Sequence, residues 1–417
     1  MRTVSRLVEA VVPARFDTGF RWLLASSWVS NLGDGLMVAA GPLLVASQTH
    51  NPLLVSGAAV ASRLPWLVFG LVAGALADRL DRRLIVMVVD SLRAIVLAGL
   101  CLVIVTGRVD IALVLLAMFA LGTAEVFADA TTGTLTPMLV EKADLGIANA
   151  RIMAGLVTVN QLLGPAIGAF LFAVGMAVPF VVQASCVALA VVLVSRIGTP
   201  KGAVRENVDT HVRQDIVEGV RWLLGHRPVR TLALVIVTFN ITWAAPWSVL
   251  VLWALQRVGI DEAGFGLLTS AAALGGLLST VSYGWLERRV PLALLMRLVL
   301  GCEVVFHLAM ALTTSPWAAY PLMFFFGAYA FVWGTLSNAV RQRAVPTEFQ
   351  GRVGSVYMIC VMVGMLIGSF LGGVIAHWGG IAAPWWFAFI GSGLTLLLVW
   401  RELGYIAHAD EEAIAAT

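Results

Sequence analysis

Charge is what this sequence has least of. Asp, Glu, Lys and Arg make up 12% of its 417 residues, about half of the roughly 25% that is usual in soluble domains. Hydrophobic residues make up 60%, more than a soluble surface accommodates, so an ordinary soluble protein is excluded. The net charge is only +3, which gives no reason to expect a nucleic-acid partner.

Cysteine pairs and the common catalytic motifs are also missing. The four cysteines lie inside apolar runs without C-x-x-C spacing, so we expect neither a disulfide framework nor a metal site. No phosphate-binding P-loop is present, which argues against ATP-driven export by this chain, and no nucleophile elbow is found. We therefore expect no enzyme, no cofactor and no bound metal.

Long apolar runs are what the chain has instead. A helix crosses the bilayer core with about 20 apolar residues, and the sequence contains twelve runs of suitable length. They predict an all-α membrane protein with two pseudo-symmetric six-helix bundles, at 22–196 and 229–402. A segment at 1–21, a linker at 197–228 and a tail at 403–417, all cytoplasmic, complete the predicted division. The twelve runs lie at about 22–46, 53–77, 84–105, 111–135, 148–172, 176–196, 229–256, 264–286, 292–312, 317–340, 352–376 and 382–402.

The placement of Lys and Arg predicts the orientation in the membrane, because cytoplasmic loops are the positively charged ones. With the N-terminus inside, the outer loops hold two of the 27 (Arg108 and Arg257), and two lie deep within the spans (Arg63 and Arg93). The other 23 lie in cytoplasmic segments or near the cytoplasmic ends of the spans. Both termini are therefore expected in the cytoplasm, and the first run is expected to be a retained helix. In the linker, His211–Gly225 has helical apolar spacing. We expect it to lie along the inner membrane surface or, alternatively, to bind a partner.

A short charged turn, Gly74–Arg83 (GALADRLDRR), separates the second and third apolar runs. It resembles motif A of the major facilitator superfamily, G-x-L-A-D-R-x-G-R-R/K, with Asp81 where that family usually has glycine. The resemblance implies two six-helix bundles related by an axis along the membrane normal. The halves of this chain match in that way at two places, about 205–210 residues apart: Gly74–Arg83 with Gly284–Arg289, and Gly164–Gly168 with Gly368–Gly372.

In the superfamily, motif A is a cytoplasmic latch between the two halves. Asp78 would meet the N-terminal end of the helix that starts near Gly351, where a carboxylate is favoured, and the arginines would add charged hydrogen bonds. A loop that only fixes topology is the alternative. The resemblance assigns to the latch Gly74, Asp78, Arg79, Arg82 and Arg83.

The fifth run carries Gly155 and, after eight intervening residues, Gly164-Pro165-x-x-Gly168. This pattern resembles motif C, which marks the exporter branches of the superfamily. The glycines Gly155, Gly164 and Gly168 would let another helix approach closely, and Pro165 would kink the run. Ordinary packing of small residues is the alternative. The stretches at 137–149 and 341–353 resemble the branch of enterobactin and macrolide exporters, the transmembrane secretion effector group.

Placing a charged side chain at the centre of a membrane helix costs about 2.5–3.5 kcal/mol on insertion scales. We therefore look for a structural or functional role for each ionisable residue inside an apolar run. Asp34 and Arg63 lie at similar depth in adjacent runs, and we predict an ion pair between them. The pair would be either structural or a means of tuning Asp34 for proton or cation binding. Glu125 and Asp129 are four residues apart on one helix face, and two carboxylates so close favour proton binding. Asp129 is alternatively a solvated residue near the cytoplasm, and this fourth run lacks the motif B arginine of the superfamily.

The resemblance implies a substrate cavity near the membrane midplane between the halves. Polar and aromatic side chains inside the runs are the candidates to line it. Glu303 and His307 are alternatively a satisfied hydrogen-bonded pair, and Asp90 and Arg93 are expected to form a gate or anchor pair. The candidate cavity residues are Asn31, Asn160, Gln161, Gln183, Asn240, Trp243, Trp247, Glu303, His307 and Asn338.

The expected function is secondary active export across a bacterial cytoplasmic membrane. An amphiphilic small molecule (a drug, antibiotic or siderophore) would move outward against an inward flow of protons by alternating access. The expected partners are this substrate, protons and the lipid bilayer, and a monomer suffices because two halves already enclose a pathway. Metabolite uptake or uniport is one alternative. A lipid-handling or receptor-like protein without proton coupling is the other.

Overall fold

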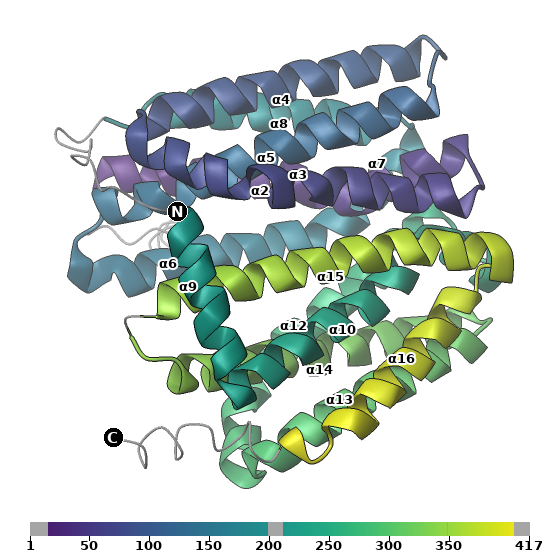
Figure 1. Ribbon diagram of the computed structural model, residues 1–417. Coiled ribbons are helices and arrows are strands. Elements are labelled where there is room, and N and C mark those ends of the chain that lie inside the picture. The colour runs from purple at the N-terminus through teal and green to yellow at the C-terminus, as the bar shows by residue number, and fades with distance from the viewer. Residues whose placement is uncertain (1–15, 199–211, 348, 404–417) are drawn as a thin grey trace, which may run out of the picture. The chain divides into compact units, whose positions relative to one another are not determined.

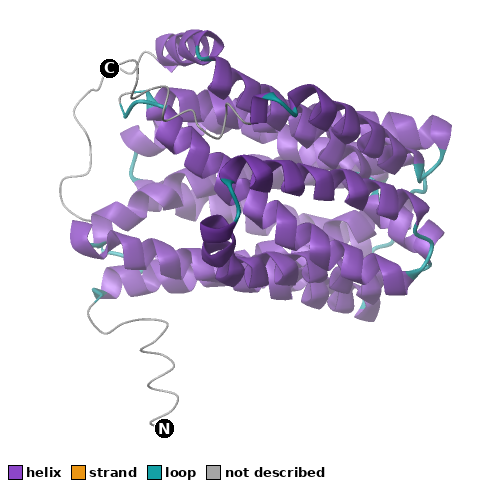
Figure 2. Cartoon of the chain, turned by 90° about the horizontal axis from the view of Figure 1, so that it is seen from below, coloured by secondary structure: helices purple, strands orange, loops and turns teal. Residues whose placement is uncertain are grey.

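The computed structural model describes residues 16–198, 212–347 and 349–403. Every regular element in these ranges is a helix, and Figure 2 shows no strand among them. Ten helical segments of this part are long and apolar enough to cross a membrane, and α8 (Val178–Val194) and α16 (Ala383–Val399) are shorter apolar helices. The predicted all-α membrane fold is confirmed.

The helices follow the twelve predicted apolar runs to within a few residues. The fifth run is divided into α6, a π-helical segment η2 and α7, and the seventh into α10, α11 and a second π-helical segment, η3. The linker contributes α9 (Val212–Gly225), which confirms the predicted helix there. The remaining bounds are α2 (Thr18–Gln48), α3 (Pro52–Arg79), α4 (Arg82–Val105), α5 (Ile111–Leu139), α6 (Leu145–Gly155), η2 (Leu156–Leu163), α7 (Gly164–Val174), α10 (Arg227–Trp247), α11 (Leu250–Leu252), η3 (Trp253–Val258), α12 (Glu262–Arg289), α13 (Leu292–Leu312), α14 (Pro316–Ala344) and α15 (Gln350–Gly379).

Two compact units divide the described chain. Unit 1 comprises the described parts of Met1–Thr49, Ala61–Val208 and Glu262–Ser270. Unit 2 comprises those of His50–Val60, Asp209–Asp261 and Ala271–Thr417. Most helices therefore belong to one unit, whereas α3 and α12 are divided between them.

Within unit 1, α2 is the helix with the most extensive packing. It lies against α5, α7 and α8, and α4 packs against α5 and α8, so these helices run side by side in Figure 1. Aspartates begin three of the helices by accepting hydrogen bonds from free backbone N–H groups: Asp17 at α2, Asp81 at α4 and Asp110 at α5. Such caps contribute about 1 kcal/mol each.

Glycines let α2 and the fifth run touch backbone to backbone. A Cβ added at Gly35 would lie 2.6 Å from the carbonyl oxygen of Asn160, and one at Gly164 would lie 2.5 Å from the Cα of Gly35. A Cβ at Gly155 would lie 2.6 Å from the indole ring of Trp28, and Gly168 is in equally close contact with Leu36. The three motif C glycines thus all face α2, as close packing through small residues requires.

Unit 2 repeats this arrangement with different helices. Gly364, Gly368 and Gly372 of α15 pack against the backbone or side chains of α10, where larger side chains would clash. α9 also packs against the beginning of α15. A Cβ at Gly219 would lie 2.9 Å from the carbonyl oxygen of Arg352, and Arg352 forms a 2.9 Å salt bridge with Glu218.

Candidate functional site: an acidic cavity in unit 1

A cavity of about 320 Å³ lies among α2, α4, α5, the fifth helical run and α8. Its size is that of a small-molecule site. Four carboxylates and one guanidinium line it, so its formal charge is −3 (−4 + 1) when all are ionised. The five charged residues are Asp34, Asp90, Arg93, Glu125 and Asp129. Hydroxyl and amide side chains, among them Ser30, Asn31 and Asn160, supply most of the remaining polar lining.

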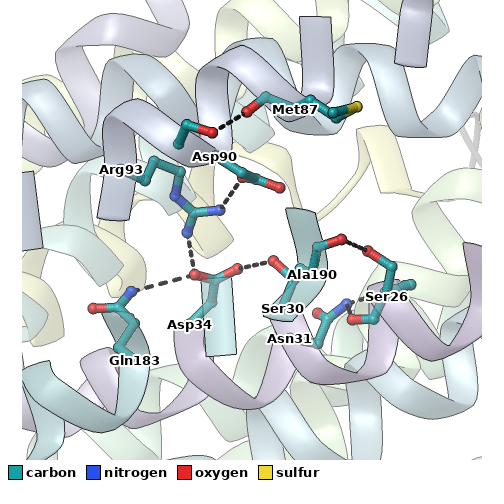
Figure 3. Close-up of polar contacts among 11 residues, drawn as sticks. Ser26, Ser30, Asn31, Asp34, Met87, Asp90, Arg93, Gln183 and Ala190 are labelled. Atoms are coloured by element: carbon teal, nitrogen blue, oxygen red, sulfur yellow. Dashed lines mark hydrogen bonds and ion pairs between the residues drawn. The ribbon is translucent and has the colours of Figure 1, made fainter. Parts of the chain in front are cut away.

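Arg93 connects two of these carboxylates (Figure 3). It forms ion pairs with Asp34 of α2 and with Asp90, three residues earlier on α4, where Nη1 lies 3.1 Å from Oδ1. The side chains of Arg93 and Asp90 are each only 4% exposed, whereas that of Asp34 is 20% exposed. Asp34 also accepts hydrogen bonds from Ser30 and from the side-chain amide of Gln183, both at 3.4 Å. A buried arginine with two carboxylate partners is compensated in charge.

Glu125 and Asp129 are different, because neither has a hydrogen bond or ion pair to any residue that the structure describes. Both project from α5 into the same cavity, with Glu125 half-buried and Asp129 exposed. The charges of Asp34 and Arg93 act on both of them. Two acceptor groups without donors, near a cation that is already engaged, leave room for a proton or a cationic group.

The structure gives Asp34 a different partner from the one we predicted. The sequence paired it with Arg63 of α3, whereas the guanidinium that reaches it comes from Arg93 of α4. The expected pairing of Asp90 with Arg93 is present. Arg63 does not line the cavity. Depth along two runs can be judged from sequence, but which helix faces which cannot.

Of the other predicted cavity residues of unit 1, two line the cavity and two do not. Asn31 and Asn160 line the cavity, and Asn31 donates 2.8 Å to the backbone carbonyl of Ser27. Gln161, the neighbour of Asn160 in the π-helical segment, is exposed and does not line it. Gln183 lies behind Asp34 as a buried donor.

The motif C glycines bear directly on this cavity. Gly35, against which Gly164 packs, immediately follows Asp34 in α2. The contact therefore fixes the height and rotation of α2 at the residue that pairs with Arg93. The glycines of the fifth run thus pack two helices together and also restrain the position of a cavity carboxylate.

In unit 2 the predicted ionisable pair is fully enclosed. Glu303 and His307 are 0% exposed, and Glu303 Oε1 lies 3.2 Å from His307 Nε2. Tyr329 donates its hydroxyl proton to Glu303, and His307 Nδ1 lies 3.3 Å from the hydroxyl of Ser392. These contacts join α13, α14 and α16, whereas Glu303 Oε1 and His307 Nε2 themselves have no hydrogen-bond partner among the described residues.

Aromatic side chains gather on α10 and α14 of the same unit. The rings of Trp243 and Trp247 stack with centroids 5.0 Å apart, and Trp247 lies 4.8 Å from the ring of Phe326. Asn240 donates its amide to the backbone of its own helix at 2.8 Å, and Asn338 is exposed and accepts from Arg341. Each tryptophan is half-buried, so both retain surface for an apolar ligand.

The motif A turn is described only in part, since the side chains of Asp78 and Arg79 lie outside the described residues. Asp81, which departs from the family pattern, accepts hydrogen bonds from the backbone N–H groups of Arg83 and Leu84 at 2.9 and 3.3 Å. The aspartate at position 81, where the family usually has glycine, thus serves as the N-terminal cap of α4. Arg82 contacts the Met138 sulfur, and Arg83 donates to the carbonyl of Ser195 within unit 1.

Arg93 lines the cavity, although its sequence position did not predict this. Its signal was the i, i+3 spacing of Asp90 and Arg93 within an apolar run, which places both charges on one face of a membrane helix. That pattern predicted their pairing but not the third partner, which comes from another helix.

Long apolar helices in two units, with a charged cavity inside unit 1, are the features of a membrane transporter of the major facilitator superfamily. The chain belongs to one family of that superfamily, the transmembrane secretion effectors, whose sequence model matches residues 9–412. It is therefore a transporter and not an enzyme.

Its curated relatives are similar along nearly their whole length. The multidrug efflux pump Tap of Mycolicibacterium fortuitum is 27% identical over 90% of this chain and 93% of its own. The enterobactin exporter EntS of Escherichia coli O1:K1 / APEC is 26% identical over 95% of both chains.

Solved structures support the fold at lower identity. A bacterial homologue of the iron transporter ferroportin superposes with a TM-score of 0.75 at 16% identity, over 93% of this chain and 98% of the other. A mutant of the nucleoside transporter NupG gives 0.76 at 10% identity, over 92% and 99%.

Proposed function

We propose that this protein exports an amphiphilic small molecule across a bacterial cytoplasmic membrane in exchange for protons. The printed functions of its relatives, multidrug efflux and enterobactin export, support the outward direction. The motif C glycines at 155, 164 and 168, which resemble those of exporters, support it too. The protein acts by alternating access with both termini in the cytoplasm, as the distribution of Lys and Arg favours, and a single copy suffices.

The proposal of proton coupling rests on the charged residues in the cavity of unit 1. Its arginine is occupied by Asp34 and Asp90, and Glu125 and Asp129 have no donor of their own among the described residues. Ionised carboxylates in a membrane protein are costly without compensation. Proton binding removes that cost, so the cavity changes its charge with the proton supply.

The same charge supports a cargo class. A site with four carboxylates and one arginine attracts a cationic group and repels a polyanion. A cationic drug therefore fits this cavity better than a polyanionic cargo.

Everted membrane vesicles test this proposal, with the cationic dye ethidium as probe. Energised vesicles that contain the protein are expected to accumulate the dye, and an uncoupler is expected to abolish the accumulation. Vesicles without the protein provide the background. Accumulation that ignores the uncoupler would reject antiport, and proton-dependent movement in the opposite direction would reject export.

A further inference from the structure

We propose that Arg93 is the positioning residue of proton coupling and that it exchanges one partner, Asp34, for another, Glu125, when a proton arrives. This inference rests on the proton-coupled export proposed above. In this inference an arginine of the third predicted span, α4, takes part in proton coupling. The superfamily usually has its motif B arginine in the fourth span, where this chain has none.

The contacts of Arg93 make it the single cation in a ring of acceptors. Asp34 and Asp90 pair with it in the structure, and its Nε has no hydrogen-bond partner among the described residues. The charges of Asp34, Asp90 and Glu125 all act on it. A guanidinium stays protonated in proteins, so Arg93 does not carry the proton itself. It selects which carboxylate remains ionised.

The helices packed around Arg93 bring several titratable or polar groups toward it. α4 itself provides Asp90, and α2 provides Asp34. α5 provides Glu125 and Asp129 and contains no Lys or Arg. α8 provides Gln183, which donates to Asp34, and Cys186, on which the charge of Asp34 acts. No described residue other than Arg93 supplies a cation to the lining of this cavity.

The exposure of the two carboxylates that pair with Arg93 determines which of them a proton reaches first. The side chain of Asp34 is 20% exposed and that of Asp90 is 4% exposed, so a proton reaches Asp34 first. An O–H bond then forms on Asp34, the carboxylate becomes neutral and its ion pair with Arg93 is lost. Arg93 keeps Asp90 and turns its freed N–H groups to Glu125, whose O–H bond breaks as its proton passes to water, so that Glu125 becomes ionised. Loss of the proton from Asp34 restores the ion pair with Arg93, and Glu125 then takes up a proton from water again.

The fork of arginine is essential to this exchange. Its planar guanidinium donates in two directions at once, whereas the ammonium of lysine is a compact point charge. Arg93→Lys is therefore expected to keep the charge but to bridge two carboxylates poorly, which alters the pH profile of transport. Arg93→Gln leaves Asp34 and Asp90 unpaired and risks misfolding. The double variant Arg93→Gln/Asp34→Asn removes one charge of each sign and leaves one carboxylate, Asp90, without its arginine instead of two, so it lowers that risk.

The first test measures ethidium accumulation in everted vesicles across pH 6–9, with Arg108→Gln in a predicted outer loop as the matched control. Wild type and Arg108→Gln are expected to share one profile. Arg93→Lys is expected to shift that profile, and the double variant to bind ethidium but to lose proton-driven accumulation by at least about tenfold. A wild-type profile in either Arg93 variant overturns the inference. Wild-type accumulation that ignores the uncoupler instead refutes the proposed function.

The second test measures the protonation of Glu125, which is expected to change when Arg93 exchanges Asp34 for Glu125. An apolar carbodiimide modifies protonated carboxyl groups, and mass spectrometry locates the adduct. Glu125 is expected to be labelled in wild type. Asp34→Asn, which imitates the protonated state, is expected to reduce that labelling by at least about tenfold, because Arg93 then holds Glu125 ionised. Equal labelling in Asp34→Asn, or none at Glu125 in wild type, overturns the exchange.

Discussion

Replacing Gly164 by alanine is expected to destabilise unit 1 and to weaken transport. The added methyl carbon would lie 2.5 Å from the Cα of Gly35 and 2.7 Å from the carbonyl oxygen of Val159. Carbon atoms in contact are normally about 3.5–4.0 Å apart, so α2 and α7 have to separate by about 1 Å. Overpacking of this kind costs about 1–3 kcal/mol.

A matched glycine isolates this effect from helix propensity. Gly99 in the middle of α4 is exposed and has nothing within 4 Å of an added Cβ. Alanine is favoured over glycine by up to about 1 kcal/mol inside a helix, and both variants gain that amount. The difference between Gly164→Ala and Gly99→Ala is therefore the overpacking cost alone.

Melting in detergent measures the difference, and ethidium accumulation measures its consequence for transport. At about 2–4 °C for each kcal/mol, Gly164→Ala is expected to melt roughly 2–12 °C below Gly99→Ala. Its transport rate is expected to fall as well, because a displaced α2 moves Asp34 away from Arg93. Equal melting temperatures and equal rates for the two variants would refute the close contact and its link to Asp34.

Three further predictions concern single contacts. Asp81→Ala is expected to cost about 1 kcal/mol of stability through loss of the α4 cap, whereas Asp81→Asn keeps it; equal melting temperatures for the two would contradict the cap. Tyr329→Phe removes the hydrogen bond that Glu303 accepts inside unit 2 and is expected to cost about 1–3 kcal/mol, so a variant with wild-type thermal stability would argue against that contact. Glu218→Ala breaks a partly exposed salt bridge with Arg352 and is expected to change stability by less than about 1 kcal/mol; a larger loss would show that α9 holds α15 in place.

The sequence predicted the helices well because each membrane crossing imposes its own requirement of about 20 apolar residues. That requirement is local and needs no knowledge of neighbours. The packing of Gly155, Gly164 and Gly168 was likewise predictable in kind, since small residues at such spacing allow close approach. The helix that they contact, α2, became known only from the structure.

The site was predicted less completely, for two physical reasons. The partner of Asp34 depends on which helices are adjacent, and the sequence offered Arg63 where the structure places Arg93. Asn160 and Gln161 lie in a π-helical segment, where the turn is wider than in an α-helix. Rotation counted at 3.6 residues per turn is then inaccurate, and only Asn160 lines the cavity. The cap at Asp81, in contrast, could have been read from an aspartate directly before an apolar run.

Proton movement in response to cargo tests the central claim most directly. Purified protein is placed in liposomes with a trapped pH-sensitive dye, the membrane potential is clamped with potassium and valinomycin, and ethidium is added outside. In wild type, and in the control Asp110→Asn, which keeps a capping side chain, the lumen is expected to become more alkaline as ethidium enters. Glu125→Gln is expected to show no such change. Proton movement in Glu125→Gln equal to wild type, or ethidium entry in wild type without any change in pH, would contradict the account.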